Sequence, residues 1–300
     1  MPRGAHGILG EIARRRGRSE YGMMRIDAHQ HFWQYDGVEY GWINDSMAAL
    51  RRDFLPADLE PLLPQSGFDG CVAVQARQTL EETRWLLQLA DEHNFIRGVV
   101  GWVDLRSDEL PNQLREFACN PKLRAVRHIV QDEPDDEFML RADFQRGIGR
   151  LAEFGLAYDV LVYPRQLPAA LRLVAQFPGQ RFVLDHIAKP LIAQRAMDPW
   201  QHDVRDLAQL PNAWCKVSGM VTEGRWTGWR AEDFHPYLDV IFDAFGSERI
   251  MIGSDWPVCT VVADYAATMG IVMDYIAKFP QQEQDAVLGG NCSEFYGLTM

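Results

Sequence analysis

The chain has 300 residues, a length that one α/β domain of about 250–300 residues accounts for without a linker. Hydrophobic residues make up 47% and charged residues 24%, which excludes disorder as a description of the whole chain. The net charge of −12 disfavours nucleic acid and anionic lipid as partners. No run reaches the roughly 20 apolar residues of a membrane span, so we expect neither nucleic-acid nor membrane binding.

The beginning of the chain differs in character from the rest. Residues 1–22 contain five Arg and two Glu, and no apolar run there is long enough for a secretory signal. We therefore expect residues 1–23 to be a disordered leader or a mis-assigned start, and residues 24–300 to form a single domain. The five cysteines are scattered and include no CxxC pair, which favours free thiols in the reducing cytoplasm.

Short apolar runs alternate with longer helical patterns along the rest of the chain. Runs rich in Val and Ile predict strands buried on both faces at 25–28, 71–75, 98–103, 124–129, 158–162, 181–185, 214–217 and 250–253. Apolar residues at helical spacing predict helices over 79–93, 141–154, 167–177, 234–245 and 263–279. Eight strands with helices between them predict a (β/α)8 TIM barrel. The alternative is an open doubly wound sheet, which would normally carry a Gly-rich phosphate loop that this sequence lacks.

Polar residues recur where the predicted strands end, which is where a barrel places its chemistry. His29 and His31 lie two apart at the end of the first strand, so both side chains should face the barrel mouth. Such a pair suits a divalent metal or an oxyanion, but it is also compatible with two satisfied structural histidines. His186 follows the sixth strand and Asp255 follows the eighth. A carboxylate directly after a buried strand is costly unless it is paired or functional, although Asp255 could simply cap a helix.

Four segments carry a family resemblance: IDAHQHFW, DHIAKP, KVSG and IGSDWP. They resemble the amidohydrolase superfamily (amidohydrolase family 2), and within it the sugar-lactone hydrolases that include L-fuconolactonase and L-rhamnonolactonase. The resemblance runs from about residue 24 to residue 298. It implies a distorted, amidohydrolase-like (β/α)8 barrel in which His29, His31, His186 and Asp255 occupy catalytic or metal-ligand positions.

The sequence also departs from the metal-dependent relatives. Tyr163 stands where the related decarboxylases have His, and we find no Lys placed to bridge two metals, so we do not expect a binuclear site. One divalent metal, with zinc as the leading candidate, could be held by His29, His31 and Asp255. A metal-independent site is the alternative, because lactones are activated esters that need less electrophilic help than amides.

Further side chains at the strand ends and in two long loops are candidates for substrate binding. The first loop spans 32–54, and the second follows the seventh strand. Aromatic residues in both could stack on sugar rings, or could simply pack the loops onto the barrel rim. Cationic residues could bind a lactone carbonyl and stabilise the oxyanion. The substrate-binding candidates are Gln75, Trp102, Arg127, His128, Tyr163, Lys189, Trp33 and Trp226.

Together these features predict a hydrolase that opens a sugar lactone, L-fucono-1,5-lactone or a similar aldonolactone. Asp255 would act as general base on water, and His29, His31 and His186 would hold a metal or bind the lactone carbonyl. Two alternatives stay open. One is a metal-dependent decarboxylase or aromatic-acid lactonase of the same superfamily, and the other is a non-catalytic carbohydrate-binding protein. We expect a small-molecule partner, and the sequence leaves the oligomeric state undecided.

Overall fold

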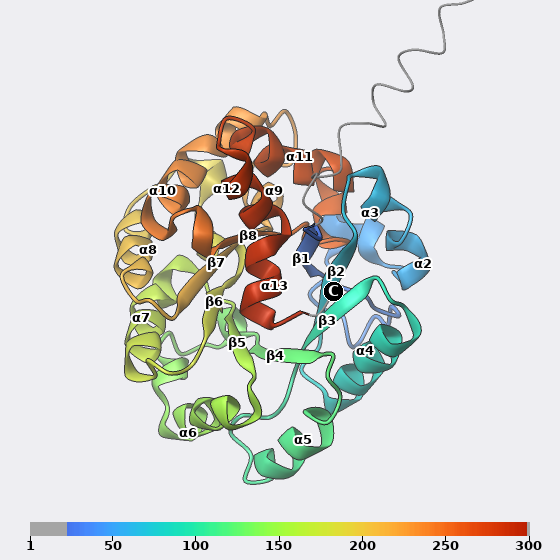
Figure 1. Ribbon diagram of the computed structural model, residues 1–300, viewed down its shortest axis with the longest axis vertical. Helices are drawn as coiled ribbons and strands as arrows, with labels where there is room; N and C mark the ends of the chain where they lie inside the picture. The colour runs from blue at the N-terminus through green and yellow to red at the C-terminus, as the bar shows by residue number, and fades with distance from the viewer. Residues whose placement is uncertain (1–22, 299–300) are drawn as a thin grey trace, which may run out of the picture.

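Eight parallel strands form the centre of the molecule, which a computed structural model describes for residues 23–298 (Figure 1). Each strand pairs with the next in chain order, from β1 to β8. The strands are β1 (Ile26–Gln30), β2 (Gly70–Val74), β3 (Ile96–Gly101), β4 (Leu123–His128), β5 (Ala157–Val160), β6 (Phe182–Leu184), β7 (Ala213–Val217) and β8 (Ile250–Ile252). Most strand residues are fully buried, as expected when both faces of a sheet are covered.

The sheet closes where β8 meets β1. Just beyond β8, the Asp255 amide donates to the carbonyl of His29 at 2.8 Å, and the His31 amide donates to the carbonyl of Trp256 at 2.6 Å. These bonds join the last strand to the first, so the predicted (β/α)8 barrel is confirmed and an open doubly wound sheet is excluded. The same bonds bring the IDAHQHFW segment next to the IGSDWP segment.

Helices surround the barrel. The five predicted helices are present as α4 (Leu80–Glu92), α6 (Ala142–Leu151), α7 (Leu167–Gln176), α10 (His235–Phe245) and α11 (Tyr265–Ile276). Helix α4 begins after Thr79, whose hydroxyl accepts from the Glu82 amide at 3.1 Å. The remaining helices were not predicted, and most are too short to show a clear apolar period. They are α2 (Pro56–Leu59), α3 (Leu62–Gln65), α5 (Leu110–Phe117), α8 (Trp200–Ala208), α9 (Met220–Glu223), α12 (Gln281–Asp285) and α13 (Asn291–Tyr296).

Helix α13 covers the end of the barrel at which the strands begin. In Figure 1 it lies across the middle of the ring of strands. Its residues Phe295 and Tyr296 pack in one buried cluster with Ile26, Val72 and Ala157, which lie at or near the starts of their strands. This end of the barrel is therefore filled by apolar side chains. The active site of such a barrel lies at the opposite end, where the strands finish.

Strand β1 contains an irregularity that matters for the site. Asp27 pairs with Cys71 and Gln30 pairs with Ala73, so β1 uses one residue more than β2 over this step. Such a β-bulge shifts the alternation of inward and outward side chains. Ile26 packs inside the barrel. The bulge allows His29, three residues later, to face the interior as well.

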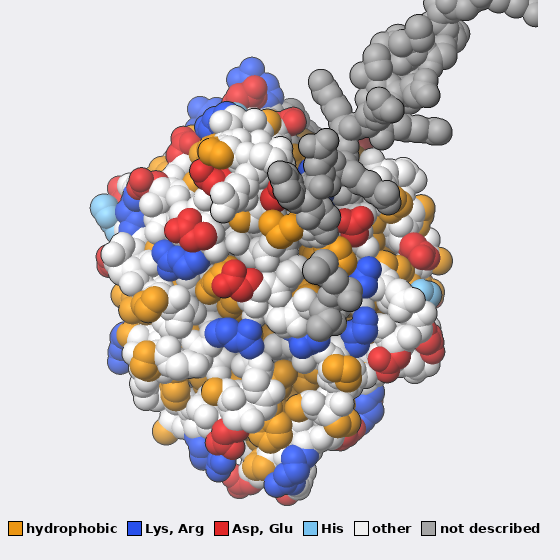
Figure 2. Space-filling model, viewed as in Figure 1, with side chains coloured by type: hydrophobic (Ala, Val, Ile, Leu, Met, Phe, Trp, Pro, Cys, Tyr) orange, Lys and Arg blue, Asp and Glu red, His pale blue; other side chains and the backbone are white. Residues whose placement is uncertain are grey.

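Three further predictions concern the surface and the ends. The predicted leader 1–23 lies almost entirely outside the described residues. None of the helices in the described part of the chain is long and apolar enough to cross a membrane. All five cysteines are described and free, with only Cys119 exposed. Figure 2 shows cationic and anionic side chains interspersed over the face that α13 covers, without a patch of one sign.

Candidate active site

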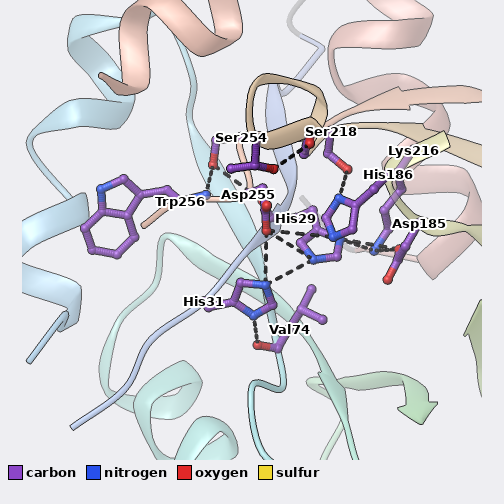
Figure 3. A network of polar contacts seen from close by, with 12 residues as sticks. His29, His31, Val74, Asp185, His186, Lys216, Ser218, Ser254, Asp255 and Trp256 are labelled. Carbon is purple, nitrogen blue, oxygen red and sulfur yellow. Dashed lines mark hydrogen bonds and ion pairs between the residues drawn. The ribbon is translucent and has the colours of Figure 1, made fainter. Parts of the chain in front are cut away.

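Asp255 lies at the centre of the polar group at the ends of the strands (Figure 3). Its Oδ1 is 3.3 Å from His31 Nε2, 3.8 Å from His186 Nε2 and 4.0 Å from His29 Nε2. These four side chains come from segments that follow or end β1, β6 and β8. The structure thus brings together the four residues that the sequence singled out for catalysis, and each is at most 5% exposed.

The hydrogen bonds of His31 fix the way its ring faces Asp255. Its Nδ1 lies 2.7 Å from the carbonyl of Val74, which can only accept, so Nδ1 carries the proton. In a neutral ring, Nε2 then directs a lone pair toward the Asp255 carboxylate. Two electron-rich groups at 3.3 Å need a proton or a cation between them. The space between His31 Nε2 and Asp255 Oδ1 is therefore suited to a proton or a cation.

Burial and neighbouring charges set the protonation of the other groups. Burial, reinforced by the cations of Lys216 and Arg127, holds the pKa of His29 well below its ordinary value. Burial likewise lowers the pKa of His186 well below its ordinary value, and the nearby Asp255 only partly opposes this. Burial alone would raise the pKa of Asp255, but His186, His31 and Lys189 together hold it below its ordinary value. At neutral pH the site therefore offers the Asp255 carboxylate beside the neutral imidazoles of His29 and His186.

The KVSG segment positions His186. Ser218 Oγ lies 2.9 Å from His186 Nδ1, which leaves Nε2 directed toward Asp255. Gly219 has φ of +62°, and a Cβ at this position would lie 2.5 Å from His186 Nδ1. Only glycine leaves room for the ring and adopts this conformation without strain. Two of the four resembling segments, KVSG and DHIAKP, therefore form one interlocked unit.

A strained turn carries both His186 and Lys189. Four successive non-glycine residues have left-handed backbones, with φ of 54°, 49°, 59° and 51° from His186 through Lys189. Each such residue costs on the order of 1 kcal/mol, and the β-branched Ile187 is especially unusual there. Strain of this kind persists only where the surrounding structure enforces it, and it is concentrated at functional sites. Here it brings His186 and Lys189 to the same cavity.

The IGSDWP segment supports the site from β8. A Cβ at Gly253 would lie 2.7 Å from His29 Cβ, so glycine allows β8 to pack closely against the histidine. Ser254 donates to the buried carboxylate of Asp27 through its amide at 2.9 Å and through its hydroxyl at 2.6 Å. Tyr265 adds a third hydrogen bond to Asp27, at 3.1 Å. Asp27, which the sequence analysis did not single out, thus ties β1 to β8 behind the catalytic group.

A cluster of charged side chains lies inside the barrel next to His29, and we call Arg127, Asp159, Asp185 and Lys216 the interior ion cluster. Lys216 Nζ lies 2.6 Å from Asp159 and 3.2 Å from Asp185, and Arg127 lies 3.0 Å from Asp185. All four are at most 3% exposed. His29 Nδ1 lies 3.3 Å from Lys216 Nζ, and His29 Nε2 lies 3.2 Å from Arg127 Nη1. The two cations offset the two carboxylates, so the cluster is electrically balanced. Asp185 Oδ1 also lies 3.4 Å from His29 Nδ1, and because a neutral imidazole has a single lone pair, the ring can accept a hydrogen bond from only one of the two cations.

The sequence analysis missed three members of this cluster. Asp159 and Lys216 are isolated charges within the apolar strands AYDV and AWCKV, and Asp185 directly precedes His186. A charge inside a fully buried strand is costly unless it is paired, and this was the available signal. Tyr296 completes the pairing from α13, because its hydroxyl donates to Asp159 at 2.8 Å.

A cavity of about 380 Å³ opens above Asp255. Of the predicted substrate-binding residues, five line it: Trp33, Arg127, Tyr163, Lys189 and Trp226. Trp33 is otherwise buried, and its indole donates to the carbonyl of Arg52, so it also packs the first loop against the rim. The cavity is also lined by two carboxylates and a further aromatic ring that were not among the predicted substrate-binding residues. These are Asp132, Glu223 and Trp42.

Three predicted substrate-binding residues lie outside the cavity lining. Gln75 is buried, and its Oε1 accepts from Arg127 Nη2 at 3.0 Å, so it holds the guanidinium in place. His128 pairs with Glu133 at 2.7 Å and stacks on Phe138. Trp102 is partly buried, and its backbone exchanges hydrogen bonds with the hydroxyl of Thr83.

The residues present fit a single metal ion. Ligand atoms of His29, His186 and Asp255 lie within 4.8 Å of one another, and two neutral imidazoles with one carboxylate form a donor set that zinc accepts. The predicted trio differs in having His31 in place of His186. The lone pair of His31 that faces Asp255 makes it a further donor at the same place. Within residues 23–298, His29, His186 and Asp255 are the one group of three or more such ligands close enough together to hold a metal ion.

Comparisons with known proteins identify the family. The family described as amidohydrolase matches residues 26–298. An L-fucono-1,5-lactonase from Burkholderia multivorans is 41% identical over 288 residues, which cover 92% of this chain and 97% of that protein. An L-fucono-1,5-lactonase from Burkholderia ambifaria is 40% identical over 280 residues, which cover 91% of this chain and 96% of that protein.

Solved structures agree with this relationship. The crystal structure of an amidohydrolase from Burkholderia multivorans with bound Zn is 42% identical and has a TM-score of 0.89. The match covers 92% of this chain and all of that one. The chain belongs to the amidohydrolase family.

Proposed function

We propose that this protein hydrolyses a sugar lactone, with L-fucono-1,5-lactone or a similar aldonolactone as substrate. The observation that carries the proposal is the position of Asp255, an ionised carboxylate at the base of a sugar-sized cavity beside the unpaired cation of Lys189. The 40–41% identity to L-fucono-1,5-lactonases over more than nine-tenths of the chain supports this substrate class.

The reaction follows from the positions of these groups. The Asp255 carboxylate accepts a proton from a water molecule as the water oxygen bonds to the lactone carbonyl carbon. Lys189, together with Arg127 in the lining of the same cavity, stabilises the negative charge that develops on the carbonyl oxygen. The bond between the acyl carbon and the ring oxygen then breaks, and the ring oxygen takes the proton from Asp255. The product is an open-chain sugar acid, which releases a proton to solvent at neutral pH.

His29, His31, His186 and Asp255 would hold one divalent metal, for which zinc is our leading candidate. Such an ion would act as a Lewis acid on the carbonyl and lower the pKa of water. The protein's own part is to keep His29 and His186 neutral by burial, to fix the His186 ring through Ser218 and to keep Asp255 ionised. The reducing cytoplasm is our proposed location, in line with the five free thiols.

The rival activities differ in the charge of their substrates. A decarboxylase or an aromatic-acid lactonase acts on molecules that already carry a carboxylate, and such molecules need free cations. Arg127 is paired with Asp185, which leaves Lys189 as the unpaired cation among the described lining residues. Asp132 and Glu223 line the same cavity and would repel an anion. The lining therefore favours a neutral lactone.

The test is a panel of aldonolactones assayed with a pH indicator, with and without prior treatment by a chelator. We expect proton release with L-fucono-1,5-lactone or a stereochemical relative. We expect Asp255→Asn to lower kcat/KM by about 10²- to 10⁴-fold with an unchanged circular-dichroism spectrum. Near wild-type kcat/KM in that variant would refute the role of Asp255. Release of carbon dioxide from an aromatic acid would favour the decarboxylase, and binding of a sugar acid without turnover of any lactone would favour a non-catalytic protein.

A further inference from the structure

Two charged side chains of the described residues line the active-site cavity without a hydrogen bond or ion pair. Lys189 reaches it from the turn after β6, and Glu223 reaches it from the last residue of α9, after β7. Within the described residues 23–298, neither side chain forms a hydrogen bond or ion pair, and they do not pair with each other. Lys189 Nζ lies over the ring of Tyr163, 5.6 Å from its centroid.

The unpaired state of Glu223 is unusual for its position. The residue is half-buried, and charged groups in such places normally find hydrogen-bond partners because desolvation is costly. Two further carboxylates, those of Asp132 and Asp255, line the same cavity, so this part of the lining offers hydrogen-bond acceptors. A ligand that binds against it must therefore bring hydrogen-bond donors, and it must not carry a negative charge of its own.

We propose that Glu223 determines substrate specificity by accepting hydrogen bonds from the ring hydroxyls of a neutral polyhydroxylated lactone. This inference rests on the proposed function and extends it to a named residue and a substrate feature. Lys189 provides the complementary donor for the carbonyl end of the ring. Tyr163 and Trp226 line the same cavity, and aromatic rings of this kind suit the C–H faces of a sugar ring.

The experiment compares two six-membered lactones that differ in their hydroxyl groups. One is L-fucono-1,5-lactone, and the other is δ-valerolactone, which has the same ring without hydroxyls. We expect Glu223→Gln to raise KM for the hydroxylated lactone about 10- to 100-fold, with kcat within about threefold of wild type, because a hydrogen bond to a charged group is lost. For δ-valerolactone, kcat/KM should stay within about twofold of wild type.

The matched control is Glu232→Gln, which removes the same charge from an exposed residue outside this cavity. It should leave KM for both lactones unchanged. An equal loss of kcat/KM for both lactones in Glu223→Gln would overturn the proposal and make Glu223 part of the general machinery or the scaffold. No change for either lactone would also overturn it.

A binding measurement separates this proposal from the proposed function. A 1,5-anhydrohexitol has the ring and its hydroxyls but no carbonyl, so it cannot be hydrolysed. Titration calorimetry should show that Glu223→Gln weakens its binding at least about tenfold while Glu232→Gln does not. If the wild-type protein turns over no lactone but shows this pattern, the proposed function fails and the role of Glu223 stands. If the wild-type protein does not bind the anhydrohexitol, or binds it as well after Glu223→Gln, the role of Glu223 fails.

Discussion

The interior ion cluster and the cavity wall are both charged, but they differ in pairing. In the interior ion cluster each charge has at least one partner within 3.2 Å, and each side chain is at most 3% exposed. On the cavity wall Lys189 and Glu223 are half-buried, and neither forms a hydrogen bond or ion pair within residues 23–298. The paired charges of the interior ion cluster hold the barrel and His29 in place. The charges of the cavity wall remain available to a ligand, as a ligand-binding surface requires.

The same substitution, lysine to methionine, should have opposite consequences in the two regions. Lys216→Met leaves two buried carboxylates, Asp159 and Asp185, without their shared cation, so we expect a loss of about 3–5 kcal/mol in the free energy of unfolding. Lys189→Met should change the free energy of unfolding by less than about 0.5 kcal/mol while lowering kcat/KM. Urea unfolding of the two variants provides the measurement. Equal destabilisation would show that the two regions do not differ as described.

An intermediate effect should come from replacing Gly219. This residue lies in the chain between Lys216 of the interior ion cluster and Glu223 of the cavity wall. Gly219→Ala adds a Cβ 2.5 Å from His186 Nδ1, so the ring must move and kcat/KM should fall about 100-fold. Gly155→Ala is the control, because Gly155 has φ of +68° and no atom within 4 Å of the added Cβ. It reports the cost of backbone strain alone. If both variants keep wild-type kcat/KM, the position of His186 does not depend on the KVSG segment.

The smallest effect should come from the outer edge of the interior ion cluster. Tyr296→Phe removes one donor to Asp159, which keeps Lys216 as its partner. We expect a loss of about 1.5–3 kcal/mol in the free energy of unfolding and a kcat within about threefold of wild type. Chemical denaturation and steady-state kinetics on one preparation would measure both. A fall in kcat much larger than threefold would show that α13 influences His29 through the cluster rather than only stabilising the barrel.

The sequence sufficed for the features that depend on local pattern. The alternation within the first strand placed His29 and His31 on one side, and the carboxylate after the last strand marked Asp255. The pairing of Lys216 with Asp159 could not be predicted, because the partners lie 57 residues apart and only the closed barrel brings them together. His128 was grouped with Arg127 although adjacent residues on a strand face opposite sides. Of these two residues, only Arg127 faces the interior and lines the cavity.

The bulge in β1 has a consequence for protein engineering. Ideal strands, which designers prefer because they fold reliably, would direct Ile26 and His29 to opposite sides of the wall. Here the extra residue between Asp27 and Gln30 allows one strand to serve the apolar interior with its first half and the site with its second. Grafting this site onto an idealised barrel would therefore require the irregular backbone to be transplanted along with the histidines.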